Sequence, residues 1–228
     1  LNAFGAGTSG SDNIAIGKTA MGLGAVSGSQ NIAIGQATAD ALVAGACIIA
    51  LGLNAYGTAA AGGLNIAIGK VAMGGSAVTG IDNIAMGTTS MDALTCGNCN
   101  IGIGINALGA ATDNMDNIAI GRSALAVSAA DGDLNIAIGQ AALGAGLVTG
   151  FNNIAIGTTS ADALTSGSVN IAMGINALGA STDGVNNIAI GEAALGASVN
   201  DGDQNVAIGK TALGEGDVSG CYNVALGN

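Results

Sequence analysis

Asn13-Ile14-Ala15-Ile16-Gly17 is the first copy of a pentapeptide that recurs along the whole chain. The first position is Asn in 12 of the 13 copies, with Ile48 the exception, and the fifth position is Gly in all 13. The nearly constant spacing of the copies shows that the sequence is an internal repeat with a period of about 17–18 residues. The copies start at positions 13, 31, 48, 65, 83, 100, 117, 135, 153, 170, 187, 205 and 223.

A longer period lies over the short one. The segment 88–95 (TTSMDALT) returns at 158–165 as TTSADALT, and the segment 105–109 (INALG) returns at 175–179. Four coils of about 17.5 residues therefore form a larger unit that is duplicated in tandem.

The composition of the repeat favours strands over helices. Ile-Ala-Ile alternates with a period of two, which is typical of a strand, and a glycine inside a helix costs about 1 kcal/mol. Short strands separated by Gly-rich turns at a fixed period predict an all-β fold, a parallel β-solenoid of about 12–13 coils of 17–18 residues each. We expect one array over residues 1–228 without a linker, with coils about 4.8 Å apart.

We predict that the large side chains of each strand, such as Ile14 and Ile16, point into the coil and that Ala15 points out. A second strand is expected at 20–22 and its equivalents, with Met21, Leu108, Leu143 and Leu213 inward and Ala20, Ala107, Ala142 and Ala212 outward. An alanine that is nearly constant on an outer surface indicates close approach of another chain. The predicted assembly face is Ala15, Ala33, Ala50, Ala67, Ala85, Ala119, Ala137, Ala155, Ala172, Ala189, Ala207 and Ala225.

The asparagine column predicts a structural ladder that bonds along the stack or caps the turns. Its members are Asn13, Asn31, Asn65, Asn83, Asn100, Asn117, Asn135, Asn153, Asn170, Asn187, Asn205 and Asn223. The glycine column predicts a corner that needs an unusual φ or close backbone approach.

Charge and composition exclude several functions. The chain has 4 basic and 15 acidic residues, a net charge of −11 and no histidine. Nucleic-acid binding is disfavoured because it depends on neutralising phosphates, and a histidine-dependent active site is impossible. The longest apolar run, 41–53, has 13 residues and is too short for membrane insertion, which needs about 20. All four cations, Lys18, Lys70, Arg122 and Lys210, follow the constant glycine, which predicts a solvated edge.

Two weaker chemical sites remain open. Asp-Gly-Asp turns at Asp131, Asp133, Asp201 and Asp203 offer oxygen ligands to calcium, although solvated turns are the favoured explanation and calcium is the second. Cys96 and Cys99 form a single CxxC, which is compatible with a local disulfide or with two free thiols. We expect no other cofactor.

The Asn-Ile-Ala-Ile-Gly and Ala-Leu-Gly pattern resembles the head repeats of trimeric autotransporter adhesins of the YadA type, and equally the repeats of phage tail fibres. The resemblance covers the whole chain and implies a left-handed β-roll, assembly into a homotrimer and exposure on a cell or virion surface. It also implies binding to host-surface proteins or glycans. The coil of this chain is longer than the coil of that family, and the additional residues fall in the turn.

These observations predict a non-enzymatic structural protein of an extracellular or surface fibre, with itself as partner. Neither end has an obvious polar cap, so we expect the chain to continue or copies to stack end to end. The alternative is a trimeric receptor-binding adhesin head or tail-fibre segment, which would bind through variable turns bearing exposed aromatics. Only Tyr56, Phe151 and Tyr222 qualify, which favours the structural function.

Overall fold

Each coil of the protein contains one short strand, and every described strand is parallel to its neighbours. The structure, a computed structural model, describes residues 3–5, 9–59, 61–128, 132–197, 202–216 and 219–228. The chain forms two compact units, Leu1–Met115 and Asp116–Asn228. The all-β parallel solenoid expected from the repeat is confirmed, and the expectation of a single array without a linker stays a prediction.

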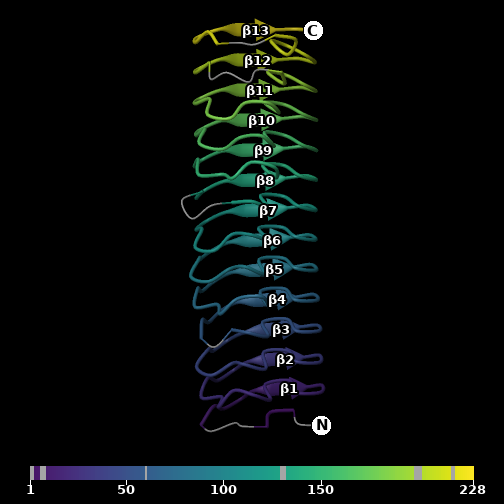
Figure 1. Ribbon diagram of the computed structural model, residues 1–228, viewed down its shortest axis with the longest axis vertical. Coiled ribbons are helices and arrows are strands. Elements are labelled where there is room, and N and C mark those ends of the chain that lie inside the picture. The colour runs from purple at the N-terminus through teal and green to yellow at the C-terminus, as the bar shows by residue number, and fades with distance from the viewer. Residues whose placement is uncertain (1–2, 6–8, 60, 129–131, 198–201, 217–218) are drawn as a thin grey trace. The chain divides into compact units, whose positions relative to one another are not determined.

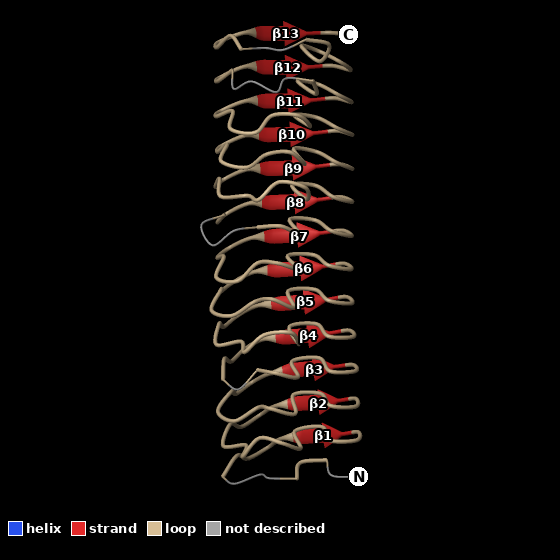
Figure 2. Cartoon of the chain, viewed as in Figure 1, coloured by secondary structure: helices blue, strands red, loops and turns tan. Residues whose placement is uncertain are grey.

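The first unit stacks six strands in chain order, in register, as Figures 1 and 2 show. These strands are β1 (Ile14–Ile16), β2 (Ile32–Ile34), β3 (Ile49–Leu51), β4 (Ile66–Ile68), β5 (Ile84–Met86) and β6 (Ile101–Ile103). Identical positions of successive coils therefore lie directly above one another.

The second unit repeats this arrangement with seven strands. They are β7 (Ile118–Ile120), β8 (Ile136–Ile138), β9 (Ile154–Ile156), β10 (Ile171–Met173), β11 (Ile188–Ile190), β12 (Val206–Ile208) and β13 (Val224–Leu226). The register pairs like with like, for example Ala137 with Ala155.

The predicted orientation of the strands was wrong, because the alanine side chains point inward. Ala33, Ala67 and Ala137 are completely buried, whereas the isoleucines beside them are half-buried or exposed. The predicted assembly face thus belongs to the core. Its members Ala33, Ala50, Ala67, Ala85, Ala119, Ala137, Ala155, Ala172, Ala189 and Ala207 are all 0% exposed, and Ala15 and Ala225 in the outermost strands are half-buried.

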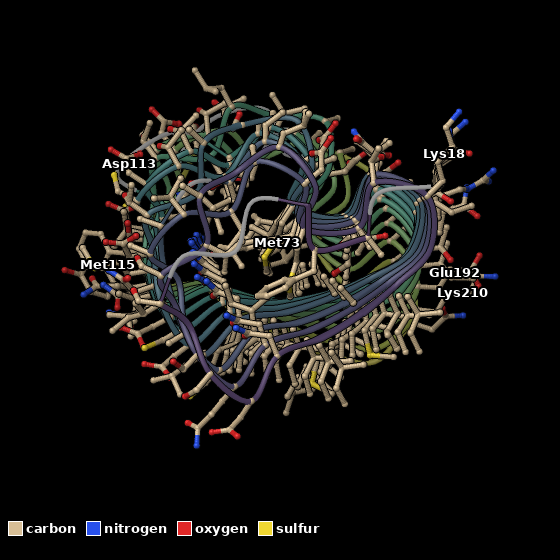
Figure 3. The ribbon with its side chains drawn as sticks, turned by 90° about the horizontal axis from the view of Figure 1, so that it is seen from below. Lys18, Met73, Asp113, Met115, Glu192 and Lys210 are labelled. Atoms are coloured by element: carbon tan, nitrogen blue, oxygen red, sulfur yellow. The ribbon has the colours of Figure 1, made fainter. Side chains whose placement is uncertain are left out.

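The interior is narrow, which explains why only small residues occupy the middle of each strand. At the single exception to alanine, Gly102, an added Cβ would lie 2.9 Å from Met91 Cε and 2.9 Å from Ser90 Oγ. In most coils the space opposite the strand is filled by the Leu or Met of the second constant segment, and Figure 3 shows Met73 in this position inside the coil. A large aliphatic residue in the middle of the strand would clash with it.

The second constant segment is a turn, so the predicted second strand was also wrong. Alternate residues have a left-handed backbone, for example Asn106 at φ 58° and Leu108 at φ 51°. Both residues of most Ala-Leu pairs are buried, because the chain bends here. The inward placement of Met21, Leu108 and Leu143 is confirmed, and Leu213 is half-buried; the outward placement of Ala20, Ala107, Ala142 and Ala212 is wrong, since these are 0–5% exposed.

The asparagine ladder is confirmed and closes each coil. Asn83 Oδ1 accepts the backbone N–H of Asn100 at 3.0 Å, and Asn83 Nδ2 donates to Gly97 O, near the end of its own coil, at 2.8 Å. The same two contacts recur at Asn153 in the second unit. Since these side chains are buried, one bond joins the coil to the next and the other closes the coil itself, where water cannot compete.

The glycine corner is confirmed on both counts. Gly52 has φ 130°, a region that residues with a Cβ rarely adopt, and a Cβ there would lie 2.6 Å from Gly69 O of the next coil.

Candidate interaction face

The first and third residues of the strands form an outward surface of large aliphatic side chains, which we call the aliphatic face. Ile34, Ile120 and Ile190 are 39%, 37% and 36% exposed although ladder neighbours cover their flanks. In the first unit the face is Ile14, Ile16, Ile32, Ile34, Ile49, Leu51, Ile66, Ile68, Ile84, Met86, Ile101 and Ile103. In the second it is Ile118, Ile120, Ile136, Ile138, Ile154, Ile156, Ile171, Met173, Ile188, Ile190, Val206, Ile208, Val224 and Leu226.

The aliphatic face of each unit is close in size to the largest apolar patch of a typical soluble monomer, which is about 300–600 Å² and often functional. Six or seven strands about 4.8 Å apart, each about 10 Å long, span about 240–300 Å² in projection in each unit. The flanks of the side chains add to this area, and patches of this kind mark interaction sites in soluble proteins. Further exposed aliphatics border the face beyond the glycine corner, at Leu53, Ile105 and Ile175.

The two edges of the aliphatic face carry opposite charges. Lys18, Lys70, Arg122 and Lys210 are exposed just beyond the C-terminal end of a strand, on what we call the basic edge. Asp12, Asp82, Asp116, Asp133 and Asp203 lie one or two residues before the asparagine that precedes a strand, on the acidic edge. Figure 3 shows Lys18 of the first unit on the right side of the coil and Asp113 and Met115 of the same unit on the left.

The basic edge contains one acidic residue, Glu192, and it is paired within the chain. Lys210 Nζ lies 3.1 Å from Glu192 Oε2, one coil away, with both side chains more than half exposed. An exposed pair of this kind contributes about 0–1 kcal/mol. Lys210 is therefore weakly held and accessible to another partner.

The calcium candidates are only partly described. Asp131 and Asp201 lie outside the described residues. Asp203 Oδ1 accepts the backbone N–H of Val185 at 2.8 Å, which is a structural use of that carboxylate. Within the described part of the chain, no three His, Cys, Asp or Glu side chains gather closely enough to hold a metal ion.

The cysteines are free and exposed in the structure. Cys96 and Cys99 form no disulfide, so of the two interpretations of the CxxC the structure shows the free thiols. Cys96 Sγ accepts a weak hydrogen bond from Thr95 Oγ1 at 3.9 Å, and Cys47 Sγ contacts Gln30 Oε1 at 3.4 Å.

Titratable groups that are fully or partly buried lie outside the aliphatic face. Burial raises the pKa of the carboxyls of Asp40, Asp92 and Asp162, which occupy the same turn position in three separate coils. Burial raises the pKa of Tyr56 to about 12. Tyr56 was expected in an exposed turn and is instead fully buried in the core, while Phe151 and Tyr222 are 49% and 77% exposed.

Sequence reasoning missed the aliphatic face, although two signals pointed to it. Alanine is replaced only by glycine in its column, which is the mark of a tightly packed interior. The flanking positions accept Ile, Val, Leu and Met, so they tolerate a change of shape that a narrow core would not.

The fold and this surface define the protein as a parallel β-solenoid with an unpaired aliphatic face. No family model, no curated protein and no solved structure matches the chain. Among the described residues there is no helix of the length and hydrophobicity that a membrane crossing requires.

Proposed function

We propose that the protein is a non-enzymatic structural element of an extracellular or surface fibre, in which copies of the chain associate through the aliphatic face. The observation that carries this proposal is the row of half-exposed Ile, Leu and Met along the strands of each unit. In water such a surface is a free-energy cost of about 25 cal/mol for every Å² left uncovered.

Identical repeats are the natural cover for this surface. Side chains in the aliphatic face recur at the strand spacing, about 4.8 Å, and a second copy offers the same spacing over the same length. Each unit offers about 240–300 Å² of this face in projection, and the side-chain flanks and the neighbouring turns would contribute the rest of the roughly 800 Å² per partner of a stable protein interface.

Composition supports a durable structural role. The chain has only 4 basic residues and, with two Phe and two Tyr, few aromatic ones, so proteases that cleave after such residues find few sites. Within each unit the parallel strands and the asparagine ladder join neighbouring coils, which leaves few segments that could open locally.

The test compares the wild type with a face variant, Ile34→Gln/Ile120→Gln/Ile190→Gln. Sedimentation should show an oligomer or filament for the wild type and a 21.3 kDa monomer for the variant. The matched control is Leu23→Gln/Leu147→Gln, which changes residues 73% and 55% exposed outside the face and should leave assembly intact. A monomeric wild type, or a face variant that still assembles, would contradict the proposal.

A further inference from the structure

Two exposed cysteines, Cys96 and Cys99, lie on one turn of the first unit, between β5 and β6. Cys96 N–H donates to Thr112 O of the next coil at 3.1 Å, and Cys99 N–H donates to Ile81 O of the previous coil at 3.1 Å. The backbone of each cysteine is thus bonded to a neighbouring coil, while both thiols are accessible from the solvent.

The two residues between the cysteines are fixed as well. Gly97 is buried, and its carbonyl O accepts from Asn83 Nδ2 at 2.8 Å. Asn98 Oδ1 accepts the backbone N–H of Ile81 at 2.8 Å. The turn is therefore preorganised, so that the two sulfur atoms can change position mainly by rotation of their own side chains.

The second unit contains the same turn without the thiols. Segment 166–169 (SGSV) repeats segment 96–99 (CGNC) after 70 residues. Its first residue donates its N–H to Thr182 O at 3.1 Å, and its last residue donates its N–H to Phe151 O at 3.0 Å. The turn therefore folds without either cysteine. Both thiols are present together in one copy and absent together from the other, which indicates a use that needs the pair.

Two thiols at this spacing can chelate a soft metal ion. Cys-x-x-Cys is the spacing with which many zinc sites place two thiolates on one ion. A structural zinc ion takes four ligands, and within the described residues no third His, Cys, Asp or Glu gathers with this pair. A monovalent d¹⁰ ion such as Cu(I) prefers thiolate sulfur and forms stable complexes with only two thiolates.

We propose that Cys96 and Cys99 together bind one soft d¹⁰ metal ion, with Cu(I) as the representative ion. On binding, each Sγ releases its proton to the solvent and forms one bond to the ion. The hydroxyl of Thr95 donates to Thr112 O at 2.8 Å, so its contact with Cys96 Sγ at 3.9 Å does not compete with a metal–sulfur bond. This site lies within the first unit and does not depend on the proposed self-association.

The test is a titration of the reduced chain with Cu(I) under nitrogen, in competition with bicinchoninate, a chromogenic Cu(I) chelator. The variant Cys96→Ser/Cys99→Val carries the residues of the second unit at these two positions, so it should remain folded, as unfolding curves would verify. Its Cu(I) affinity should be about 100-fold or more weaker than that of the wild type, because the second thiolate no longer binds intramolecularly. The matched control, Cys47→Ser/Cys221→Ser, removes the other two thiols and should bind one ion with the affinity of the wild type.

Single substitutions test whether the two thiols act as a pair. Cys96→Ser and Cys99→Ser should each lose nearly as much affinity as the double variant, since either change leaves one thiolate. A single variant that binds Cu(I) as tightly as the wild type would overturn the proposal, as would an equal loss in the Cys47→Ser/Cys221→Ser control. Recovery of Cys96 and Cys99 as an intramolecular disulfide that takes up no ion, identified by mass spectrometry, would also overturn it.

Discussion

Two neighbouring coils of the first unit have duplicates in the second unit, and the duplicates pack different residues at the same interior positions. In the first unit Met91 lies below Gly102, and at the equivalent positions of the second unit Ala161 lies below Ala172. Ser90 Oγ donates to Gly102 O at 2.8 Å, and Ser160 Oγ donates to Ala172 O at 2.9 Å, so the surroundings are matched.

The difference shows that the Met91 side chain and a methyl group at position 102 compete for the same space. At this level the methionine leaves no room for a methyl group on the strand above, since a Cβ on Gly102 would lie 2.9 Å from Met91 Cε. Met73, at the equivalent turn position, lies below a strand that keeps its alanine, Ala85, so the conflict belongs to the packing of Met91. Where the turn residue is alanine, the strand retains its own alanine, and both are 0–1% exposed.

The largest expected change in the free energy of unfolding comes from a double-mutant cycle at Met91 and Gly102. Met91→Ala should lower the free energy of unfolding by about 2–5 kcal/mol, because it leaves a cavity. Gly102→Ala should lower it by about 1–3 kcal/mol through overpacking. The double variant recreates the pair of the second unit, so it should be more stable than Met91→Ala alone, as measured by denaturant unfolding.

The reciprocal cycle serves as the control. Ala161→Met should overpack the second unit by a similar amount, and Ala172→Gly in that background should relieve it. Additive effects in both cycles would show that the paired residues do not share a common space.

The asparagine ladder is interrupted at one position in the first unit. Ile48 stands where the other coils have Asn, and the same coil carries Tyr56 where the other coils have Leu, Met or Ala. Tyr56 Oη accepts from Asn65 Nδ2 at 3.0 Å and donates to Ala61 O at 3.0 Å. In a regular rung the acceptor is the previous asparagine, as in the 3.0 Å bond from Asn100 Nδ2 to Asn83 Oδ1.

Removal of the Tyr56 hydroxyl should cause the next largest loss of stability. Tyr56→Phe leaves an N–H of Asn65 buried without its acceptor and should lower the free energy of unfolding by about 1–3 kcal/mol. In Tyr56→Leu, the further change Ile48→Asn should recover part of the loss, because it restores the regular rung. Absence of recovery would show that the tyrosine does not substitute for the missing asparagine.

The pH dependence of stability at alkaline pH tests the burial of the Tyr56 hydroxyl separately. The pKa of Tyr56 is raised to about 12 in the folded protein, above its usual 10, because burial disfavours the phenolate. A raised pKa contributes stability that is fully present below pH 10 and lost as the pH rises from about 10 to about 12. The free energy of unfolding should therefore fall more steeply over this interval in the wild type than in Tyr56→Phe.

The sequence predicts the coil well and the direction of its side chains poorly. Period, strand position, the asparagine ladder and the glycine corner all follow from residues that cannot vary, such as Gly52 with its positive φ. A period of two shows that Ile14 and Ile16 share a side but not which side is inward. The same period also describes the alternating left-handed turn around Leu108, which is why a second strand was expected there.

The features that the sequence did not predict depend on contacts between residues of neighbouring coils. The space of Gly102 is set by Met91 of the coil below, and the burial of Tyr56 depends on its contact with Asn65 of the next coil. The edge charges are visible in the sequence, but their meaning depends on which side of the strand faces outward. That orientation follows from the packing of the core.

The smallest expected effect concerns the left-handed turn, where the chain again offers a matched pair. Val71 at φ 59° and Asn106 at φ 58° occupy the same place, two residues after the constant glycine. A β-branched residue is strained in this conformation, whereas asparagine tolerates it. Val71→Asn should therefore raise the free energy of unfolding by about 1 kcal/mol, after the loss of a half-buried side chain is included. Asn106→Val should lower it by a similar amount, and thermal unfolding of both variants measures the difference. Equal stability of Val71→Asn and the wild type would mean that packing of the valine offsets its backbone strain.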